Sequence, residues 1–199
     1  MHFIKQKRFF SKKEYTILEH KLHFKTSYIG GENEGIIAFE DISKEKSTNK
    51  ETNPILLIIS IFLYLLAGAS FVWRNDKDVD KEMWIVFTLM ATSLLIVYIV
   101  MRENSWKIKT YNKGFLYLFK NNQNEKEVNA FIDTLFLERD NYLKQTYLNL
   151  DANLSYETQV NDLKWLRNVE AISREEFNKY YDDLKLLFAP KKGNIGFER

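Results

Sequence analysis

The sequence predicts an α+β membrane protein: a small antiparallel sheet with a capping helix, interrupted by a two-helix transmembrane hairpin and followed by a C-terminal helical hairpin. Two uncharged apolar runs, 54–73 and 83–101, predict the spans. Apolar residues alternate at period two on both sides of these runs, as in strands, and later recur at i, i+3, i+4 and i+7, as in helices. We therefore expect N-terminal strands in 1–53, the hairpin in 54–101, further strands and the capping helix in 102–150, the helical hairpin in 151–190 and a flexible tail in 191–199.

Each apolar run is long enough to cross a bilayer. At 1.5 Å of rise per residue, about 19 residues span roughly 28 Å, close to the hydrocarbon thickness. The alternative is a buried helical hairpin of a soluble core, which would show a polar face. Neither run has a polar face beyond a few hydroxyl groups, so we prefer the membrane interpretation. The lack of charge inside the runs removes the usual mark of an ion path through a single copy.

The charge distribution predicts that both termini are cytoplasmic. Ten Lys and Arg residues precede the first run, and Arg102, Lys107, Lys109 and Lys113 follow the second, whereas the connector 74–82 has mixed charge. Positive residues stay on the cytoplasmic side of a membrane. Tryptophans anchor membrane interfaces, and the candidates here are Trp73 and Trp84 at the outer interface and Trp106 at the inner one.

Small residues at similar depth predict where the two spans pack on each other, because small side chains let helices approach closely in lipid. The candidates are Ala67, Gly68 and Ser70 in the first span and Thr88, Ala91 and Thr92 in the second. The alternative, that these residues face lipid, stays open.

The N-terminal segment interleaves aromatic and basic residues, a pattern that suits the surface of an anionic leaflet. The residues that would contact the membrane surface are Lys5, Lys7, Arg8, Phe9, Phe10, Lys12 and Lys13. The alternative is an ordinary first strand with solvated lysines.

Further strands follow in order. Alternation predicts three strands, around 15–17, 22–28 and 36–39, with a glycine-rich turn at 29–35. The polar stretch 44–53 lacks periodicity and is expected to be a lead into the membrane. After the hairpin we expect a strand at 106–110, a tight turn at Asn112-Lys113-Gly114, a strand at 115–119, a polar loop at 121–126 and an amphipathic helix whose stripe runs from Val128 to Leu143.

Several of these segments carry a family resemblance. The residues are Phe39-Glu40-Asp41-Ile42 before the hairpin, the strand pair around Asn112-Lys113-Gly114, and the helix start Glu127–Leu135. Over roughly Phe9 to Tyr147 the chain resembles bacterial pleckstrin-homology-like (PH-like) membrane proteins in which two spans interrupt the domain. The resemblance implies a bent sheet capped by the helix, in the bacterial inner membrane, that serves as a binding or scaffolding module. It supplies no lipid-headgroup residues, because these relatives share no fixed phosphoinositide motif.

The C-terminal part predicts two short helices. One follows Asn153-Leu154-Ser155, and the other begins at a capping box, Ser173 to Glu176, and ends before Pro190. The pair is similar to a short C-terminal oligomerisation-type helical motif of bacterial membrane proteins. Its candidate self-association residues are Trp165, Leu166, Phe177, Tyr181 and Leu184. The alternative is a helical hairpin packed on its own domain.

The sequence predicts no enzyme, no cofactor and no metal. Cysteine is absent, which removes thiolate ligands and nucleophiles. His20 and His23 are three apart on a predicted strand and point to opposite faces. Solvation or capping accounts for the carboxylate pairs 40–41, 175–176 and 182–183, and the glycine-rich turn lacks the Lys-Ser/Thr of a phosphate loop.

The preferred function is a non-enzymatic, membrane-anchored cytoplasmic module for binding or scaffolding. Its expected partners are membrane lipids and either a second copy or another protein, and the net charge of +2 gives no reason to expect nucleic acid. One alternative is an oligomeric membrane effector, or a membrane protein of toxin immunity or phage defence. Another is a sensor of anionic lipid.

Overall fold

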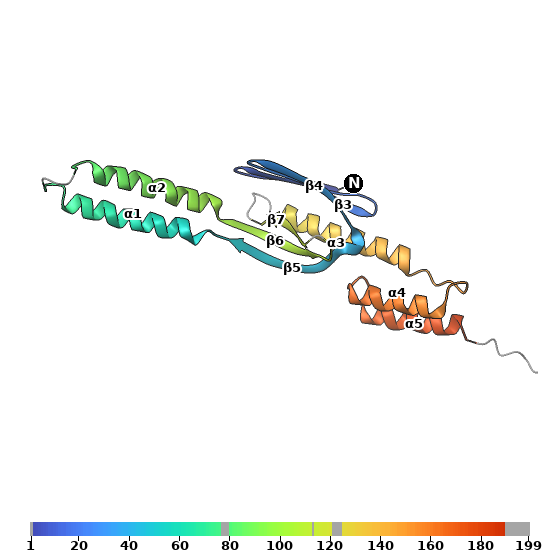
Figure 1. Cartoon of the computed structure of the whole chain (residues 1–199). Coiled ribbons are helices and arrows are strands. Elements are labelled where there is room, and N and C mark those ends of the chain that lie inside the picture. The colour runs from blue at the N-terminus through green and yellow to red at the C-terminus, as the bar shows by residue number, and fades with distance from the viewer. Residues whose placement is uncertain (1, 77–79, 113, 121–124, 190–199) are drawn as a thin grey trace, which may run out of the picture. The chain divides into compact units, whose positions relative to one another are not determined.

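The computed structural model describes residues 2–76, 80–112, 114–120 and 125–189 (Figure 1). Contacts divide the chain into two compact units. The first comprises residues 1–46, 108–116 and 123–199, and the second comprises residues 47–107 and 117–122. Several expected features lie outside the described residues: part of the connector (77–79), Lys113 of the tight turn, most of the polar loop (121–124), Pro190 and the whole tail (191–199).

The first sheet has four antiparallel strands in the order of the sequence: β1 (His2–Arg8), β2 (Ser11–Ile17), β3 (Lys21–Tyr28) and β4 (Gly31–Ala38). Alternate residues of each strand point to the inner face of the sheet. The buried members of this face include Ile4, Tyr15, Ile17, Leu22 and Ile37. A short 3-10 helix, η1 (Phe39–Asp41), ends this part of the chain and buries Phe39 completely.

Two expectations for this sheet, on the N-terminal segment and on the glycine-rich turn, can be compared with the structure. The N-terminal segment is strand β1, paired with β2 along its whole length, so the interpretation as an ordinary first strand holds for its secondary structure. The expected turn at 29–35 is wrong for most of its length, because residues 31–35 belong to β4. Aromatic rings of β3 take the space that the glycines leave: a Cβ on Gly35 would lie 2.9 Å from the Phe24 ring, and one on Gly31 would lie 2.9 Å from the Tyr28 hydroxyl.

The second sheet has three antiparallel strands in the order β5 (Ile42–Glu51), β6 (Glu103–Thr110) and β7 (Gly114–Phe119). The expectation that 44–53 is an irregular lead is therefore wrong. Only the first two residues of β5, Ile42 and Ser43, are buried, so most of the strand carries no apolar alternation for sequence reasoning to detect. Its pairing with β6 depends on backbone hydrogen bonds, which leave no mark in the side-chain pattern.

Two apolar helices occupy the chain between β5 and β6: α1 (Pro54–Val72) and α2 (Met83–Met101), at the left of Figure 1. Asn53 begins α1 by accepting a hydrogen bond from the Ile55 amide. Both helices have 19 residues, with mean hydropathies of 2.6 and 2.3 over their most apolar windows, of which only 11% and 6% is buried. They are thus long and apolar enough to cross a membrane, and they lack the burial of a soluble core.

Polar contacts align α1 with α2. The hydroxyl of Ser60 is buried and donates to the carbonyl of Ala91 at 2.9 Å. One turn further along, the hydroxyls of Tyr64 and Thr92 share a hydrogen bond of 2.9 Å. Because a hydroxyl in apolar surroundings needs a partner, these bonds favour one register of the two helices.

Helix α3 (Glu125–Tyr147) covers the inner face of the four-stranded sheet within the first unit. The Phe131 ring lies 6.4 Å from the Tyr15 ring. The buried residues of α3 follow the stripe that the sequence predicts: Val128, Phe131, Ile132, Leu135, Arg139 and Leu143. The helix extends beyond that stripe at both ends. The residues of these outer turns are largely exposed, so apolar periodicity does not mark them.

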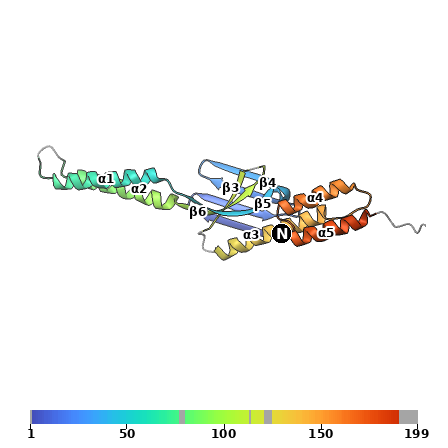
Figure 2. The same cartoon turned by 90° about the horizontal axis from the view of Figure 1, so that it is seen from below.

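Helices α4 (Tyr156–Asn168) and α5 (Arg174–Leu187) run side by side (Figures 1 and 2). Ser155 begins α4 by accepting from the Thr158 amide. The predicted capping box of α5 is confirmed, since the Ser173 hydroxyl accepts from the Glu176 amide while the Glu176 carboxylate accepts from the Ser173 amide. The pair shares an apolar core with α3, in which Leu143, Leu166 and Leu184 are fully buried.

Cations from α3 and β5 hold the connection between α4 and α5. The Arg139 guanidinium is completely buried, and it donates to the Val169 carbonyl and to Asp140, each at 2.8 Å. Lys44 of β5 donates to the Glu170 carbonyl at 2.8 Å and pairs with Asp140 at 2.5 Å. Carbonyls at a helix C-terminus lack intrahelical donors, so these cations satisfy groups that would otherwise be orphaned.

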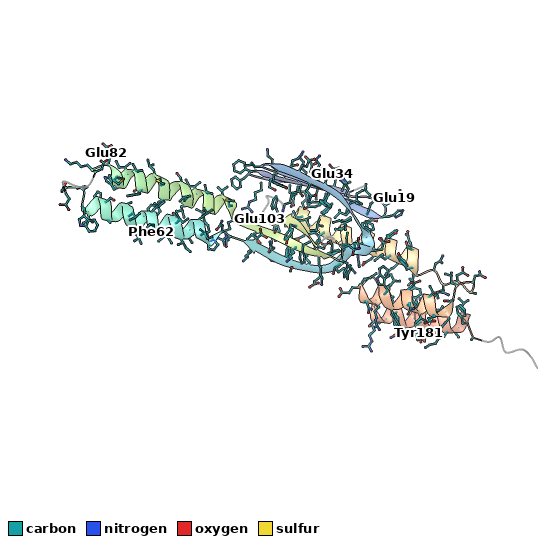
Figure 3. The ribbon with its side chains drawn as sticks, viewed as in Figure 1. Glu19, Glu34, Phe62, Glu82, Glu103 and Tyr181 are labelled. Carbon is teal, nitrogen blue, oxygen red and sulfur yellow. The ribbon has the colours of Figure 1, made fainter. Side chains whose placement is uncertain are left out.

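A ladder of charges crosses the outer face of the four-stranded sheet, where Figure 3 labels Glu34. Lys5, Glu14, Lys25 and Glu34 lie opposite one another on successive strands. Hydrogen bonds from His23 and then Lys25 lower the pKa of Glu34. The Lys12 ammonium lowers the pKa of Glu14, and Glu32 raises the pKa of Lys25 from a distance of 2.6 Å.

The replacement Arg139→Met should loosen the attachment of α4 and α5, because it keeps most of the side-chain volume but leaves the buried Val169 carbonyl without its donor. We expect a loss of about 1–3 kcal/mol in the free energy of unfolding, measured by urea titration of the full chain in detergent. Proteolytic cleavage between α3 and α4 should also become faster. Lys164→Met, on an exposed position of α4, is the matched control. Equal behaviour of the two variants would contradict the role of Arg139.

The charge ladder should stabilise the folded state near neutral pH, and this stabilisation should be lost at acidic pH. A carboxyl whose pKa is lowered by folding stabilises the folded state above the ordinary glutamate pKa of about 4.3, and this contribution is lost as pH falls through the lowered value. Glu34→Gln should therefore reduce the urea midpoint near pH 7 and leave it almost unchanged near pH 3. Glu19→Gln, outside the ladder, serves as control. A difference from wild type that stayed constant with pH would contradict this account.

Candidate functional site

Two hairpin turns project large apolar side chains from one end of the four-stranded sheet. Phe9 and Phe10 form the turn between β1 and β2, and Tyr28 and Ile29 lie at the turn between β3 and β4. The exposed fractions of these side chains are 60%, 71%, 54% and 71%. We call this group of four residues the tip. It lies at the end of the sheet opposite η1, because β4 runs from the tip to η1.

A shallow groove of about 250 Å³ lies between the two turns. Its walls combine the four apolar residues of the tip with two lysines and two serines: Lys7, Phe9, Phe10, Ser11, Lys12, Ser27, Tyr28 and Ile29. The strand register explains this gathering, because Lys12 and Ser27 lie opposite each other on β2 and β3. Residues that are 15 apart in the sequence therefore share one surface.

The backbone of the first turn is strained. Phe9 has a φ of +40°, whereas the second turn uses Gly30 at +94°. A residue with a Cβ is unfavourable in the left-handed region, and a bulky one especially so. Glycine or asparagine would make the first turn at lower cost, so its two phenylalanines are not explained by turn formation alone.

The seven residues expected to contact a membrane surface divide between the two faces of the sheet. Lys5, Lys7 and Lys12 belong to the outer face, with Phe9 and Phe10 at the tip. Lys13 is on the inner face and only 8% exposed, so the structure removes it from this surface. Arg8 is half-buried at the end of β1. Tyr28 and Ile29 were missed by sequence reasoning, although an aromatic and an aliphatic residue before Gly30-Gly31 form a turn that is unusually apolar.

The residues expected to pack the spans differ in how far the structure buries them between α1 and α2. Ala67 and Ala91 are buried between α1 and α2, but Gly68 is exposed, with nothing within 4 Å of the place where a Cβ would stand. Ser70 is half-buried. Thr88 and Thr92 donate to carbonyls of their own helix, at Trp84 and Thr88, each at 2.7 Å. Sequence reasoning did not place Ser60 in this interface.

The three tryptophans proposed as anchors lie near helix ends or just beyond. Trp73 follows α1 and is 58% exposed. Trp84, in the first turn of α2, makes an edge contact with Phe71 at 5.4 Å, and Arg74 lies 4.2 Å from the same Phe71 ring. Trp106 of β6 lies under the ammonium of Lys120 at 4.1 Å.

The five residues proposed for self-association all lie in the core that α4 and α5 share with α3, or against it. Leu166 and Leu184 are completely buried there. Trp165 makes an edge contact with Tyr147 of α3 at 4.9 Å, and Phe177 stacks on Tyr181 at 5.7 Å. This placement matches the alternative of a helical hairpin packed on its own domain.

The ionisable groups considered for chemistry are spread over the first unit. His20 is exposed and its ring lies tilted against that of Tyr142, with the ring centroids 4.8 Å apart, whereas His23 lies 2.9 Å from Glu34. Glu40 accepts a hydrogen bond from Tyr142, which raises the pKa of that phenol. Asp41 accepts from the side chain of Asn112. Within the ranges that the structure describes, no group of three or more His, Asp or Glu residues could hold a metal ion.

An open cavity of about 740 Å³ lies at the end of the sheet away from the tip. It is lined by residues of mixed charge and polarity: His2, Ile17, Leu18, Glu19, His20, Lys21 and Glu138. Its lining includes both acidic and basic side chains, so its charge selects no class of ligand.

Comparison with known proteins gives no match to a family model, to a curated protein or to a solved structure.

Proposed function

We propose that this protein is a non-enzymatic, membrane-anchored module for binding or scaffolding, built on a PH-like domain that a transmembrane hairpin interrupts. The observation that carries the proposal is the place of the hairpin: α1 and α2 occur between β5 and β6, which are neighbours in one sheet. An anchor placed before or after a domain could swivel on its linker. An anchor between two paired strands is tied to the sheet by both of its ends.

The surface of the hairpin supports a lipid environment. Large apolar side chains point outward from both helices, away from the face where the helices contact each other. They include Ile58 (65% exposed), Leu65 (68%) and Leu89 (64%), and Phe62 is labelled among them in Figure 3. A water-exposed apolar surface of this extent is unfavourable for a soluble protein. Lipid contact removes that cost, because hydrocarbon chains solvate such side chains as well as a protein core does.

The proposed orientation places both termini in the cytoplasm of a bacterium, with the protein in the inner membrane. The distribution of Lys and Arg across the hairpin supports it. The PH-like description rests on the order of the elements, namely four strands, three strands and then helix α3.

The alternative of a pore-forming effector receives little support from α2. A water-filled oligomeric pore would need a polar stripe, and the candidate hydroxyls are those of Thr88, Thr92 and Ser93. Each of them donates to a carbonyl of its own helix, at 2.7–2.8 Å. Their hydrogen-bonding capacity as donors is therefore already used.

Cysteine labelling should report the proposed topology directly, because the natural chain contains no cysteine. A membrane-impermeant maleimide added to intact spheroplasts should label Asn75→Cys in the connector and leave Ser155→Cys unlabelled. Permeabilisation should make Ser155→Cys reactive. Both positions are exposed, so a difference in labelling reports sidedness and not burial. Labelling of Ser155→Cys in intact spheroplasts, or equal labelling of both, would overturn the proposal.

Deletion of 128–143 should test whether the cytoplasmic part is one interrupted domain. This deletion removes the buried stripe of α3, so the sheet should lose its core and become protease-sensitive. The hairpin should stay in the membrane, which carbonate extraction would show. A cytoplasmic part with unchanged protease resistance would refute the interrupted domain.

A further inference from the structure

We propose that the tip of the four-stranded sheet docks on the surface of an anionic bilayer, with Phe9, Phe10, Tyr28 and Ile29 entering its interfacial zone and Lys7 and Lys12 contacting lipid phosphates. The inference rests on the proposed function only in assuming that a bilayer is present. It adds a second contact with that bilayer, made by the folded domain itself, and it assigns a role to the turn between β3 and β4.

The apolar character of the tip supports contact with a bilayer. Its four side chains, all more than half exposed, belong to two neighbouring turns, so they form one patch and not scattered surface residues. Single exposed apolar residues are ordinary, but a grouped set marks a contact surface. Phenylalanine, tyrosine and isoleucine on a turn are suited to the headgroup boundary, where apolar side chains leave water without entering a protein core.

The strained backbone of the first turn also supports docking. Phe9 keeps a φ of +40° on a turn where its side chain contributes nothing to the buried core. Strain of this kind persists where the surrounding structure and a functional demand retain it. A two-residue turn projects its side chains far from the sheet, and this geometry is what shallow insertion requires.

The positive charge beside the tip favours an anionic bilayer surface over a neutral one. Lys7 and Lys12 line the groove beside the apolar side chains, and Lys12 shares Glu14 with Lys5, at 2.8 and 3.4 Å. Glu32 lies opposite Ser27 near the tip, but Lys25 pairs with it at 2.6 Å. The acids near the tip are thus matched by lysines, and Lys7 adds a positive charge. Cations beside an apolar patch favour an anionic leaflet over a neutral one.

The test uses the full chain reconstituted as single copies in lipid nanodiscs. Phe10→Cys and, separately, Ile29→Cys are labelled with an environment-sensitive fluorophore. Glu19→Cys, in the turn between β2 and β3 at the other end of the sheet, is the matched control. Nanodiscs of phosphatidylcholine alone are compared with nanodiscs containing a quarter phosphatidylglycerol, each with or without spin-labelled lipid as a shallow quencher.

We expect both tip labels to show blue-shifted emission and at least twofold quenching in the anionic nanodiscs, with less quenching in neutral nanodiscs or at high salt. The control label should show neither effect. Adding Lys7→Gln and Lys12→Gln to Phe10→Cys should remove most of the dependence on anionic lipid. Equal quenching of the tip and control labels would overturn the inference.

Other occupants of the tip give different results. If the tip bound a second copy of this chain, the blue shift would require two copies in one nanodisc and would ignore lipid charge. If the groove bound free phosphate, inorganic phosphate would suppress the signal at constant ionic strength. Either result would overturn bilayer docking.

A label at Phe62→Cys on α1 separates this inference from the proposed function. Quenching of this label by a deep spin probe shows that the hairpin is embedded. An embedded hairpin with an unquenched tip would refute only the docking of the tip. A hairpin that is not embedded would refute the membrane anchor itself.

Discussion

The pairing of β5 with β6 is the constraint on which the second unit depends. The chain leaves the sheet after Glu51 and returns at Glu103 to a neighbouring strand, so the segment between them must begin and end at nearly the same place. Two antiparallel helices of equal length, 19 residues each, meet that requirement. The bonds from Ser60 to Ala91 and between Tyr64 and Thr92 then favour the register in which both helices return to the sheet together.

Strong local patterns made the helices of this architecture predictable. The apolar runs have the bounds of α1 and α2 to within a residue, the stripe from Val128 to Leu143 is the buried face of α3, and the capping box at Ser173 begins α5. In each case the signal and the structure lie within a few turns of one helix. Helical periodicity and capping are local properties, so a single sequence contains them.

Non-local pairing accounts for what sequence reasoning missed. Strand β5 is held by backbone bonds to a strand that lies more than 50 residues away, and the role of Arg139 depends on the Val169 carbonyl, just beyond the end of α4. The tip depends on two turns that the register of four strands brings together. One signal was available and was overlooked: Lys13 shares the parity of Tyr15 and Ile17, which places it on the inner face of β2.

The distribution of exposed apolar residues also limits how the C-terminal helices can act. Leu166 and Leu184 are committed to the core with Leu143, so using them for self-association would require α4 and α5 to leave α3. Such release would also remove the donors from the Val169 and Glu170 carbonyls, a cost that any partner would have to offset. Partners of the docked pair would therefore bind its exposed outer faces, which combine charged residues with the exposed Leu186 and Leu187. The hairpin and the tip also expose large apolar side chains, and a lipid contact at either would need no rearrangement of the core.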